Sequence, residues 1–294
     1  MSAFKCGTVA IVGRPNTGKS TLLNKLVGEK LAIVSSKAQT TRHLVTGILN
    51  AAGCQYVFID APGFQSKNVN VLNRALNRRA TEAARAADIV LLVFEALKLG
   101  TADRAVLARI PASAKVVAVV NKVDTVAHSI ELLPYLERLA QERDFVAIVP
   151  VSASTGKNLP ELLRVVRAQL PGGPAAYPPE QLTDRDERFF ATEILREKLF
   201  RFLGEELPYH TDVVLERFRE QGRLRRIDAT ILVERDSQKP IVVGKGGETL
   251  KRIGSAARKD MERLFGGKVY LGVWVKVKRG WTEDARMLKQ LGYA

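Results

Sequence analysis

The sequence has few of the residues that build metal clusters or disulfide frameworks. Its 294 residues include two cysteines and three histidines. Cys6 and Cys54 flank expected strands without the spacing of metal ligands, and the histidines, at positions 43, 128 and 210, are far apart in the chain. Reduced thiols in a cytosolic protein are therefore expected, rather than a zinc site or a disulfide-stabilised secreted fold.

Long hydrophobic runs are also absent. No stretch of about eighteen uncharged apolar residues occurs, so the sequence predicts no transmembrane helix. The segment from Met1 to Gly7 has no apolar core, which predicts no secretory signal. With 46% hydrophobic residues the chain can still form a sizeable core, and its length allows two domains. A cytoplasmic protein is expected.

Positive charge is in excess. The formal net charge is +15, and residues 221–294 contain 17 Lys and Arg against 8 Asp and Glu. More than half of the excess therefore lies in the last quarter of the chain. A polyanionic partner would be attracted to such a surface, although charge alone also fits a basic surface that only aids solubility.

The first 170 residues alternate between short apolar runs and helical patterns. Strands are expected at 8–12, 55–60, 88–94, 115–120 and 145–151, with an added edge strand at 44–50. Helices are expected at 18–27, 70–86, 102–109, 129–142 and 159–169. Strands alternating with helices predict an α/β fold with a doubly wound, mostly parallel sheet.

The alternation stops at Leu170. Residues 171–179 are rich in Pro and Gly, so a linker or a strap across the surface is expected. The remaining expected elements are a helix at 186–203, strands at 212–219 and 227–234, a glycine-rich turn at 244–247, a helix at 248–265, a strand at 268–278 and a short C-terminal helix. They predict a smaller α+β domain. The expected boundaries are 1–172, a linker at 173–185, and 186–294.

A phosphate loop of the pattern Gly-x4-Gly-Lys-Ser lies between the first expected strand and helix. Its glycines allow several backbone N–H groups to converge on phosphate oxygens, and the helix start adds a partial positive charge. Lys19 can reach the terminal phosphates, and Ser20 can ligate Mg²⁺. The expected contacts are Gly13, Arg14, Pro15, Asn16, Thr17, Gly18, Lys19, Ser20 and Thr21.

The peptide Asp60-Ala61-Pro62-Gly63 is a candidate sensor of a terminal phosphate. Asp60, at a strand end, can hold Mg²⁺ through water, and Gly63 can offer its N–H to a γ-phosphate. A loop of this kind can adopt two states, depending on whether that phosphate is present.

The peptide Asn121-Lys122-Val123-Asp124 identifies the base as guanine. A carboxylate accepts two hydrogen bonds from the N1–H and the 2-amino group of guanine, and adenine offers no such pair. Ser152 and Ala153 follow the next strand, where a backbone N–H can contact the guanine oxygen. The ligands predicted are GTP and GDP, with Mg²⁺ as cofactor.

The peptide Gly244-Lys245-Gly246-Gly247 resembles the Gly-x-x-Gly loop of the KH RNA-binding motif, and the two strands before it fit the type II order. Beyond it, Trp281 is expected to stack on a base, whereas Trp274, beside two valines, is expected in the core. The expected RNA contacts are Gly244, Lys245, Gly246, Gly247, Lys251, Arg252, Lys276, Lys278 and Trp281.

Together these motifs resemble those of translation-factor-related GTPases, and the whole chain is similar to the bacterial Era family. Residues 37–43 look like the first switch of that family, in which Thr41 would close on Mg²⁺ and the γ-phosphate; the adjacent Thr40 leaves the assignment one residue uncertain. The resemblance implies a GTPase that binds 16S ribosomal RNA near its 3′ end and assists assembly of the small ribosomal subunit. A monomer is expected.

The catalytic apparatus lacks a glutamine at the usual place. Phe64 stands where a Ras-like switch carries the residue that orients water, and Gln65 is one place too late. Slow hydrolysis is expected unless another group holds the water. In related GTPases an asparagine matching Asn16 helps hold K⁺; turn stabilisation is the alternative here. The expected catalytic residues are Asn16, Lys19, Thr41 and Gly63.

Three other functions remain open on the sequence. The first is an RNA-anchored GTP sensor with negligible turnover, which Phe64 favours. The second is a phosphotransferase acting on a small molecule, which the guanine-reading peptide opposes. The third is peripheral contact with the inner face of the cell membrane through the basic surface, for which the chain offers no amphipathic anchor.

Overall fold

The computed structural model describes residues 4–35, 37, 39–65, 70–204 and 206–293. The residues group into two compact units, one made of 1–34, 41–69 and 73–184, the other of 35–40, 70–72 and 185–294. Ala38, within the segment 37–43 expected to form the first switch, lies outside the described residues.

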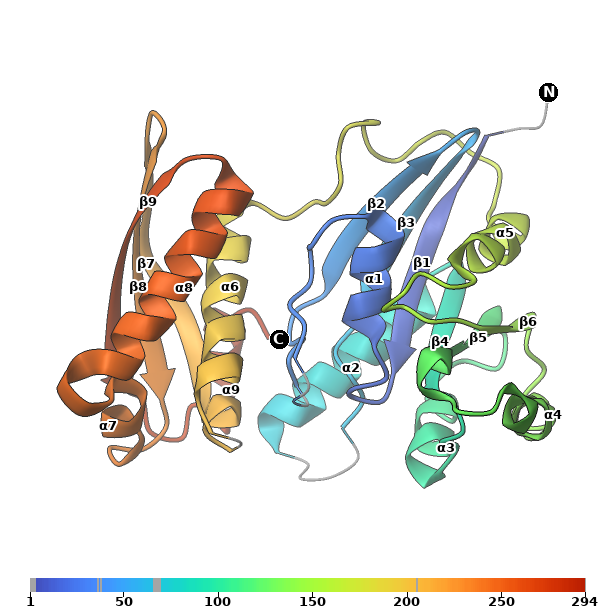
Figure 1. Cartoon of the computed structure of the whole chain (residues 1–294), viewed down its shortest axis with the longest axis horizontal. Helices are drawn as coiled ribbons and strands as arrows, with labels where there is room; N and C mark the ends of the chain where they lie inside the picture. Colours follow the sequence, from blue (N-terminus) through green and yellow to red (C-terminus); the bar gives the residue numbers. More distant parts are fainter. Residues whose placement is uncertain (1–3, 36, 38, 66–69, 205, 294) are drawn as a thin grey trace. The chain divides into compact units, whose positions relative to one another are not determined.

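The first unit is built on a six-stranded sheet in the order β2-β3-β1-β4-β5-β6 (Figure 1). Only β2 runs antiparallel to its neighbour, and the described pairs among the other strands are parallel. The strands are β1 (Lys5–Gly13), β2 (Val45–Ala51), β3 (Cys54–Asp60), β4 (Ile89–Glu95), β5 (Val116–Asn121) and β6 (Ala147–Pro150).

Near-continuous runs of β-branched and aliphatic residues form these strands because both faces of the sheet are covered by helices. In β4 and β5, residues such as Val90, Leu92 and Val117 are fully buried. The covering helices are α1 (Lys19–Val27), α2 (Val71–Ala86), α3 (Thr101–Leu107), α4 (Leu132–Ala140) and α5 (Leu159–Gln169). The predicted α/β fold with a mostly parallel sheet is confirmed.

The Pro/Gly-rich segment after α5 is a strap along the outer strand of the sheet. The Leu182 carbonyl accepts a 2.8 Å hydrogen bond from the Ile48 amide, and the Pro179 carbonyl accepts one from Asn50 Nδ2. The strap thus pairs with backbone groups of β2 that would otherwise form an open sheet edge.

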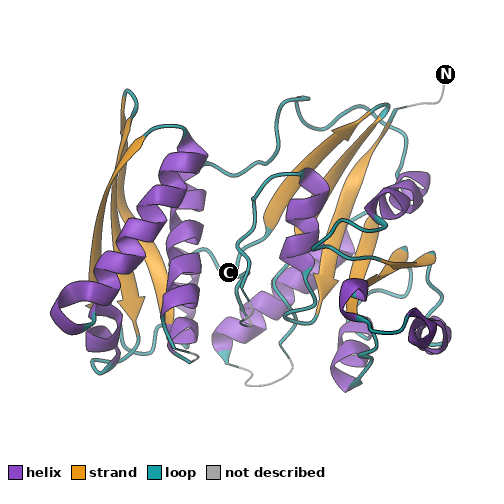
Figure 2. Cartoon of the chain, in the orientation of Figure 1, coloured by secondary structure: helices purple, strands orange, loops and turns teal. Residues whose placement is uncertain are grey.

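The second unit has a three-stranded sheet in the order β7-β8-β9, in which β7 and β8 are antiparallel and β8 and β9 parallel (Figure 2). Its strands are β7 (Thr211–Gln221), β8 (Leu224–Val233) and β9 (Lys268–Val277). Its helices are α6 (Glu187–Phe202), α7 (Gln238–Val243), α8 (Glu248–Phe265) and α9 (Ala285–Gln290). Helices α6 and α8 lie side by side on one face of the sheet (Figure 1). Phe265 of α8 packs edge-on against Phe218 of β7.

Helix α7 is not predicted by the sequence pattern. Its residues include Pro240 and two consecutive valines, a composition that disfavours a helix. Pro240 is nevertheless tolerated because it lies in the first turn, where an amide hydrogen has no partner within the helix. In the described part of the chain, every helix is too short or too polar to cross a membrane.

Candidate functional site

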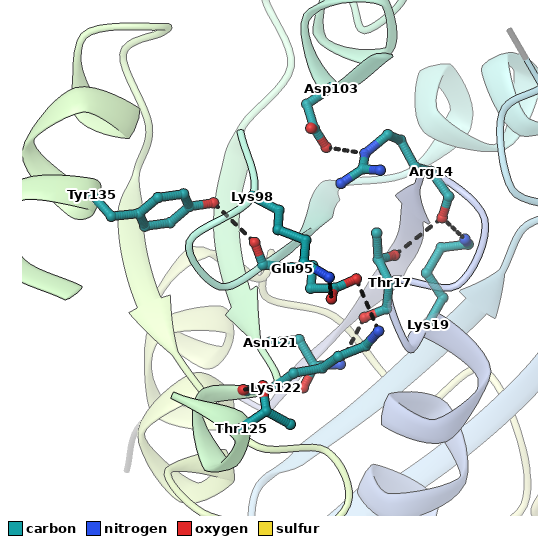
Figure 3. Close-up of polar contacts among 10 residues, drawn as sticks. All are labelled: Arg14, Thr17, Lys19, Glu95, Lys98, Asp103, Asn121, Lys122, Thr125 and Tyr135. Carbon is teal, nitrogen blue, oxygen red and sulfur yellow. Dashed lines mark hydrogen bonds and ion pairs between the residues drawn. The ribbon is translucent and has the colours of Figure 1, made fainter. Parts of the chain in front are cut away.

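The phosphate loop joins β1 to α1 through backbone conformations that favour glycine. Gly18 has a φ of +93°, and Asn16 has a φ of +63°. The Lys19 side chain is buried, and its Nζ donates a 2.7 Å hydrogen bond to the Arg14 carbonyl across the loop (Figure 3). Burial lowers the pKa of Lys19 to about 8. The loop is thus closed around an ammonium group that can contact phosphate.

An ion pair that the sequence did not reveal ties the loop to α3. Arg14 Nε lies 2.5 Å from Asp103 Oδ1, and the other oxygen of Asp103 accepts from the Gly100 amide (Figure 3). Asp103 is buried, so this contact ties the phosphate loop firmly to α3. No spacing rule connects residues so far apart in the chain, and only the fold brings them together.

A cluster of oxygen atoms fits the predicted Mg²⁺ site. The Ser20 hydroxyl donates to Asp60 Oδ2 over 2.6 Å, and Thr41 Oγ1 lies 2.8 Å from Ser20 Oγ. Asp60 is fully buried, and its Oδ1 has no hydrogen-bond partner among the described residues. Burial raises the pKa of Asp60 to about 6. Hydroxyl and carboxylate oxygens around an unsatisfied oxygen are the donor set that Mg²⁺ prefers.

The geometry separates the two candidate switch threonines. Thr41 Oγ1 also donates to Asp60 Oδ2, at 3.4 Å, so Thr41 belongs to the oxygen cluster. Thr40 turns its hydroxyl to the Lys37 carbonyl at 2.7 Å. The described residues include no group of three or more His, Cys, Asp or Glu side chains arranged to hold a metal.

Asn121 joins the predicted guanine site to the phosphate loop. Its Nδ2 donates a 2.8 Å hydrogen bond to the Thr17 carbonyl, and its Oδ1 accepts one of 2.9 Å from the Ala153 amide (Figure 3). A Cβ on Gly18 would lie 2.2 Å from Asn121 Nδ2, so glycine is required there for this approach. The motifs at 13–20, 121–124 and 152–153 therefore meet at one edge of the sheet.

Asp124 is exposed and held ready to accept hydrogen bonds. Ser154 Oγ donates to Asp124 Oδ2 over 3.1 Å, and the hydrogen bond from Ser152 lowers the pKa of Asp124. Lys122, two residues before Asp124, forms a 2.9 Å ion pair with Glu95 at the end of β4 (Figure 3). This ion pair ties the 121–124 peptide to the neighbouring strand. An ionised carboxylate in this position is the chemistry that a guanine ring needs.

The Asp60–Gly63 loop rests directly on the phosphate loop. A Cβ on Gly63 would lie 2.8 Å from the Cα of Pro15, and the Phe64 amide donates to the Gly13 carbonyl. The Phe64 ring is buried in the core. The Gln65 side chain folds back to donate to the Gly63 carbonyl at 3.3 Å. The Gln65 amide is thus engaged within its own loop.

The Gly-Lys-Gly-Gly loop lies between α7 and α8 and has the backbone that its glycines allow. Gly244, Gly246 and Gly247 have φ values of +76°, +59° and +83°. Lys245 is exposed at its tip. On the first turns of α8, Lys251 is exposed and the Arg252 guanidinium lies 4.5 Å from the centre of the Phe202 ring. The loop can thus offer backbone amides and positive charge to a nucleotide strand.

The expected roles of the two tryptophans are wrong. Trp281 is fully buried and its Nε1 donates to the His210 carbonyl, so it cannot stack on a base. Trp274 is 52% exposed instead. Trp274 lies on the outward face of β9 together with the exposed Lys276. Trp281 lies beyond the end of the strand, where the chain folds back and the Thr282 hydroxyl donates a hydrogen bond to Glu234. Alternation along β9 therefore did not predict the burial of Trp281. Lys278 is exposed as expected.

Comparison with known proteins finds two family matches, one in each unit. Residues 8–122 match the family described as 50S ribosome-binding GTPase, and residues 206–282 match the KH domain family. GTPase Era of Nitrosomonas eutropha is 49% identical over 99% of each chain. GTPase Era of Chromobacterium violaceum is 50% identical over 98% of each chain.

Two solved structures of Era share the whole fold. One is a variant of Aquifex aeolicus Era bound to GDP and aluminium fluoride, with a TM-score of 0.95, 35% identity and 99% coverage of both chains. The other, with the same values, is Era in complex with MgGDPNP and nucleotides of 16S ribosomal RNA. The similarity extends over both units and over both sets of motifs. The chain is therefore a GTPase and belongs to the Era family.

Proposed function

We propose that the protein is a GTP-hydrolysing switch that binds 16S ribosomal RNA near its 3′ end and assists assembly of the small ribosomal subunit. The guanine contacts of Asp124 and the glycine loop before α8 supply the two ligand sites. The complex of a related Era with MgGDPNP and 16S ribosomal RNA supports the same pair of ligands here. The sites belong to domains proposed at 1–172 and 186–294, joined by the segment 173–185, in a monomer.

The observation that best supports a switch is that two adjacent residues, Thr40 and Thr41, belong to different units. Thr41 belongs to the first unit, and its hydroxyl contacts Ser20 and Asp60. Thr40 belongs to the second unit, and its carbonyl accepts a 3.0 Å hydrogen bond from the buried Arg196 of α6. If Thr41 moves to coordinate a phosphate-bound Mg²⁺, the adjacent residues 35–40, which belong to the second unit, would have to move with it.

The coupling has a direct test. RNA affinity is measured for the full chain with a non-hydrolysable GTP analogue, with GDP and without nucleotide. We expect at least a several-fold difference between the first two states. Equal affinities would remove the coupling, because a ligand with the same affinity for both conformations shifts no equilibrium.

The alternative is an RNA-anchored GTP sensor with negligible turnover, and the buried Phe64 favours it. Single-turnover hydrolysis with and without small ribosomal subunits separates the two functions. A rate that rises when subunits are added supports the hydrolysing switch; GTP that stays intact in both conditions supports the sensor. The assembly role predicts that cells depleted of the protein accumulate incomplete small subunits, seen as a changed sedimentation profile.

A further inference from the structure

The sheet of the second unit has an outward face whose residues the glycine loop does not use. Along β9, Val269 and Val275 are buried under the helices, whereas Lys268, Tyr270, Trp274 and Lys276 are exposed. This alternation places the exposed set on the face opposite α6 and α8. Tyr270 is 54% exposed, and Trp274 is 52% exposed. Two large aromatic rings thus stand in solvent on one strand, about 13 Å apart along its backbone.

Gly272 lies between the two rings on the same face and leaves room for one of them. A Cβ at this position would come 2.8 Å from Cη2 of Trp274. The far edge of the indole therefore reaches back over the backbone of Gly272. The Asp228 carboxylate lies beside the same spot, with Oδ1 2.7 Å from the position of that Cβ. The indole and this carboxylate thus fill the space over Gly272, and flat groups can lie on the half-exposed rings of Tyr270 and Trp274.

The cations of this face are concentrated beside Tyr270. Arg219 of β7 pairs in register with Arg226 of β8, which pairs in register with Tyr270 of β9. The Arg226 guanidinium lies 5.3 Å from the centre of the Tyr270 ring. Like charges directly opposite on neighbouring strands are destabilising in the absence of a counter-charge.

Among the described residues, no carboxylate lies within ion-pair distance of Arg219, Arg226 or Lys268. The two acids on this face are already engaged, since Asp228 is 3.8 Å from Arg217 and Glu216 is 3.5 Å from Lys276. The face therefore carries uncompensated positive charge next to exposed aromatic rings.

We propose that this outward face, centred on Tyr270, Trp274, Arg219 and Arg226, is a second RNA-binding surface that stacks unpaired bases. Aromatic rings on a sheet accept bases of any sequence, and a guanidinium plane stacks on them as well. The free cations neutralise the phosphates that accompany the bases. The surface lies on the opposite side of the sheet from the helices that carry the glycine loop, so one RNA strand can occupy both by passing around the sheet edge. The proposal extends the RNA-binding function proposed above.

Affinity for short and long RNA tests the proposal in the full-length chain. The probes are labelled random-sequence RNAs of about 5 and 20 nucleotides, because the glycine-loop groove alone accepts about four nucleotides. We expect the Tyr270→Ala/Trp274→Ala variant to bind the short RNA within two-fold of wild type. Its affinity for the long RNA should fall roughly 5- to 100-fold. Unchanged affinity for the long RNA, or an equal loss for both probes, would overturn the proposal.

A matched pair of charge variants controls for non-specific electrostatics. Arg226→Gln and Arg263→Gln each remove one exposed arginine, but Arg263 lies on α8, and its partner Asp260 is on that helix. Arg226→Gln should weaken binding of the long RNA at least five-fold more than Arg263→Gln does. Equal effects would show that the face contributes only non-specific electrostatic attraction, and the proposal of a specific RNA-binding surface would be refuted.

Tryptophan fluorescence reports contact directly. Trp274 and Trp281 are the only tryptophans of the chain, and Trp281 is buried, so emission that acrylamide can quench comes from Trp274. Long RNA should quench that emission and protect it from acrylamide, and a Trp274→Phe variant should lose the signal while keeping RNA affinity. If anionic phosphatidylglycerol vesicles shift the emission and RNA leaves it unchanged, the face is a membrane surface and the proposal fails. Absence of short-RNA binding in the wild type would contradict the glycine-loop site instead, which separates the two proposals.

Discussion

The side-chain amide of Asn121 donates a hydrogen bond to the Thr17 carbonyl over 2.8 Å, and both groups are buried. The phosphate loop and the guanine loop are therefore joined directly by a buried hydrogen bond. The Gly18 backbone allows this contact because no side chain stands in the way of the amide.

Removing this link should lower both stability and nucleotide affinity. Asn121→Ala leaves the Thr17 carbonyl and the Ala153 amide without their partner, at a cost of about 1–3 kcal/mol for each buried group. Gly18→Ala should have a similar effect from the other side. Gly100→Ala is the matched control, because a Cβ there meets nothing within 4 Å. Denaturation midpoints and GTP dissociation constants measure the effect; a Gly18→Ala protein that matches Gly100→Ala would contradict the link.

Asp124→Asn should change the base that is bound. An amide cannot accept both guanine hydrogen bonds, so GTP affinity should fall about 10- to 100-fold while xanthosine triphosphate affinity rises. Competition binding with the two nucleotides gives the ratio. Asp144→Asn is the control, since Asp144 precedes β6 and lies at the opposite edge of the parallel strands. If the preference for GTP stays the same, the base-reading role of Asp124 is wrong.

Thr41→Ala and Thr40→Ala form a matched pair for the metal site. Loss of the Thr41 hydroxyl removes an oxygen beside Ser20 and Asp60, so single-turnover hydrolysis should slow about 10²-fold and should need more Mg²⁺. Thr40→Ala removes a bond to the Lys37 carbonyl and should leave the Mg²⁺ requirement as in wild type. The measurement is the hydrolysis rate of both variants as a function of Mg²⁺ concentration. A larger effect from Thr40→Ala would show that Thr40, and not Thr41, belongs to the metal site.

The choice of monovalent cation should control hydrolysis if Asn16 helps hold K⁺. With Phe64 buried and the Gln65 amide bonded to the Gly63 carbonyl, a cation beside the phosphates would supply charge stabilisation, so hydrolysis in K⁺ should exceed that in Na⁺ at least about ten-fold. Asn16→Ala should abolish the difference when the rates in the two salts are compared at saturating GTP. Equal rates of the wild type in both salts would rule out this role.

The two tryptophans should differ sharply in stability. Trp281→Ala removes a fully buried ring and its bond to His210, which should cost about 3–5 kcal/mol in the free energy of unfolding. Trp274→Ala removes an exposed ring and should cost less than about 1 kcal/mol. Urea denaturation measures both, and similar values for the two variants would show that their burial is misassigned.

Local patterns determined much of the protein in advance. The bounds of α8 and the start of β9 agree with the sequence because Gly247 and Gly266, both at positive φ, end the regular structure on either side of α8. Near-continuous apolar runs identified the buried strands of the parallel sheet, although β1 begins at Lys5, before the expected residue 8. The three nucleotide-binding peptides were identified because each is contiguous and its chemistry depends on residues within it.

The tertiary structure decided what depends on residues distant in sequence. The pairing of Arg14 with Asp103, the choice of Thr41 over Thr40 and the row from Arg219 through Arg226 to Tyr270 all depend on how separate elements come together. Which tryptophan was buried could not be read from alternation alone, because Trp281 lies beyond the strand and its burial depends on the path of the returning chain. Motifs are local and so can be read from the sequence, whereas burial and pairing are properties of the packed fold.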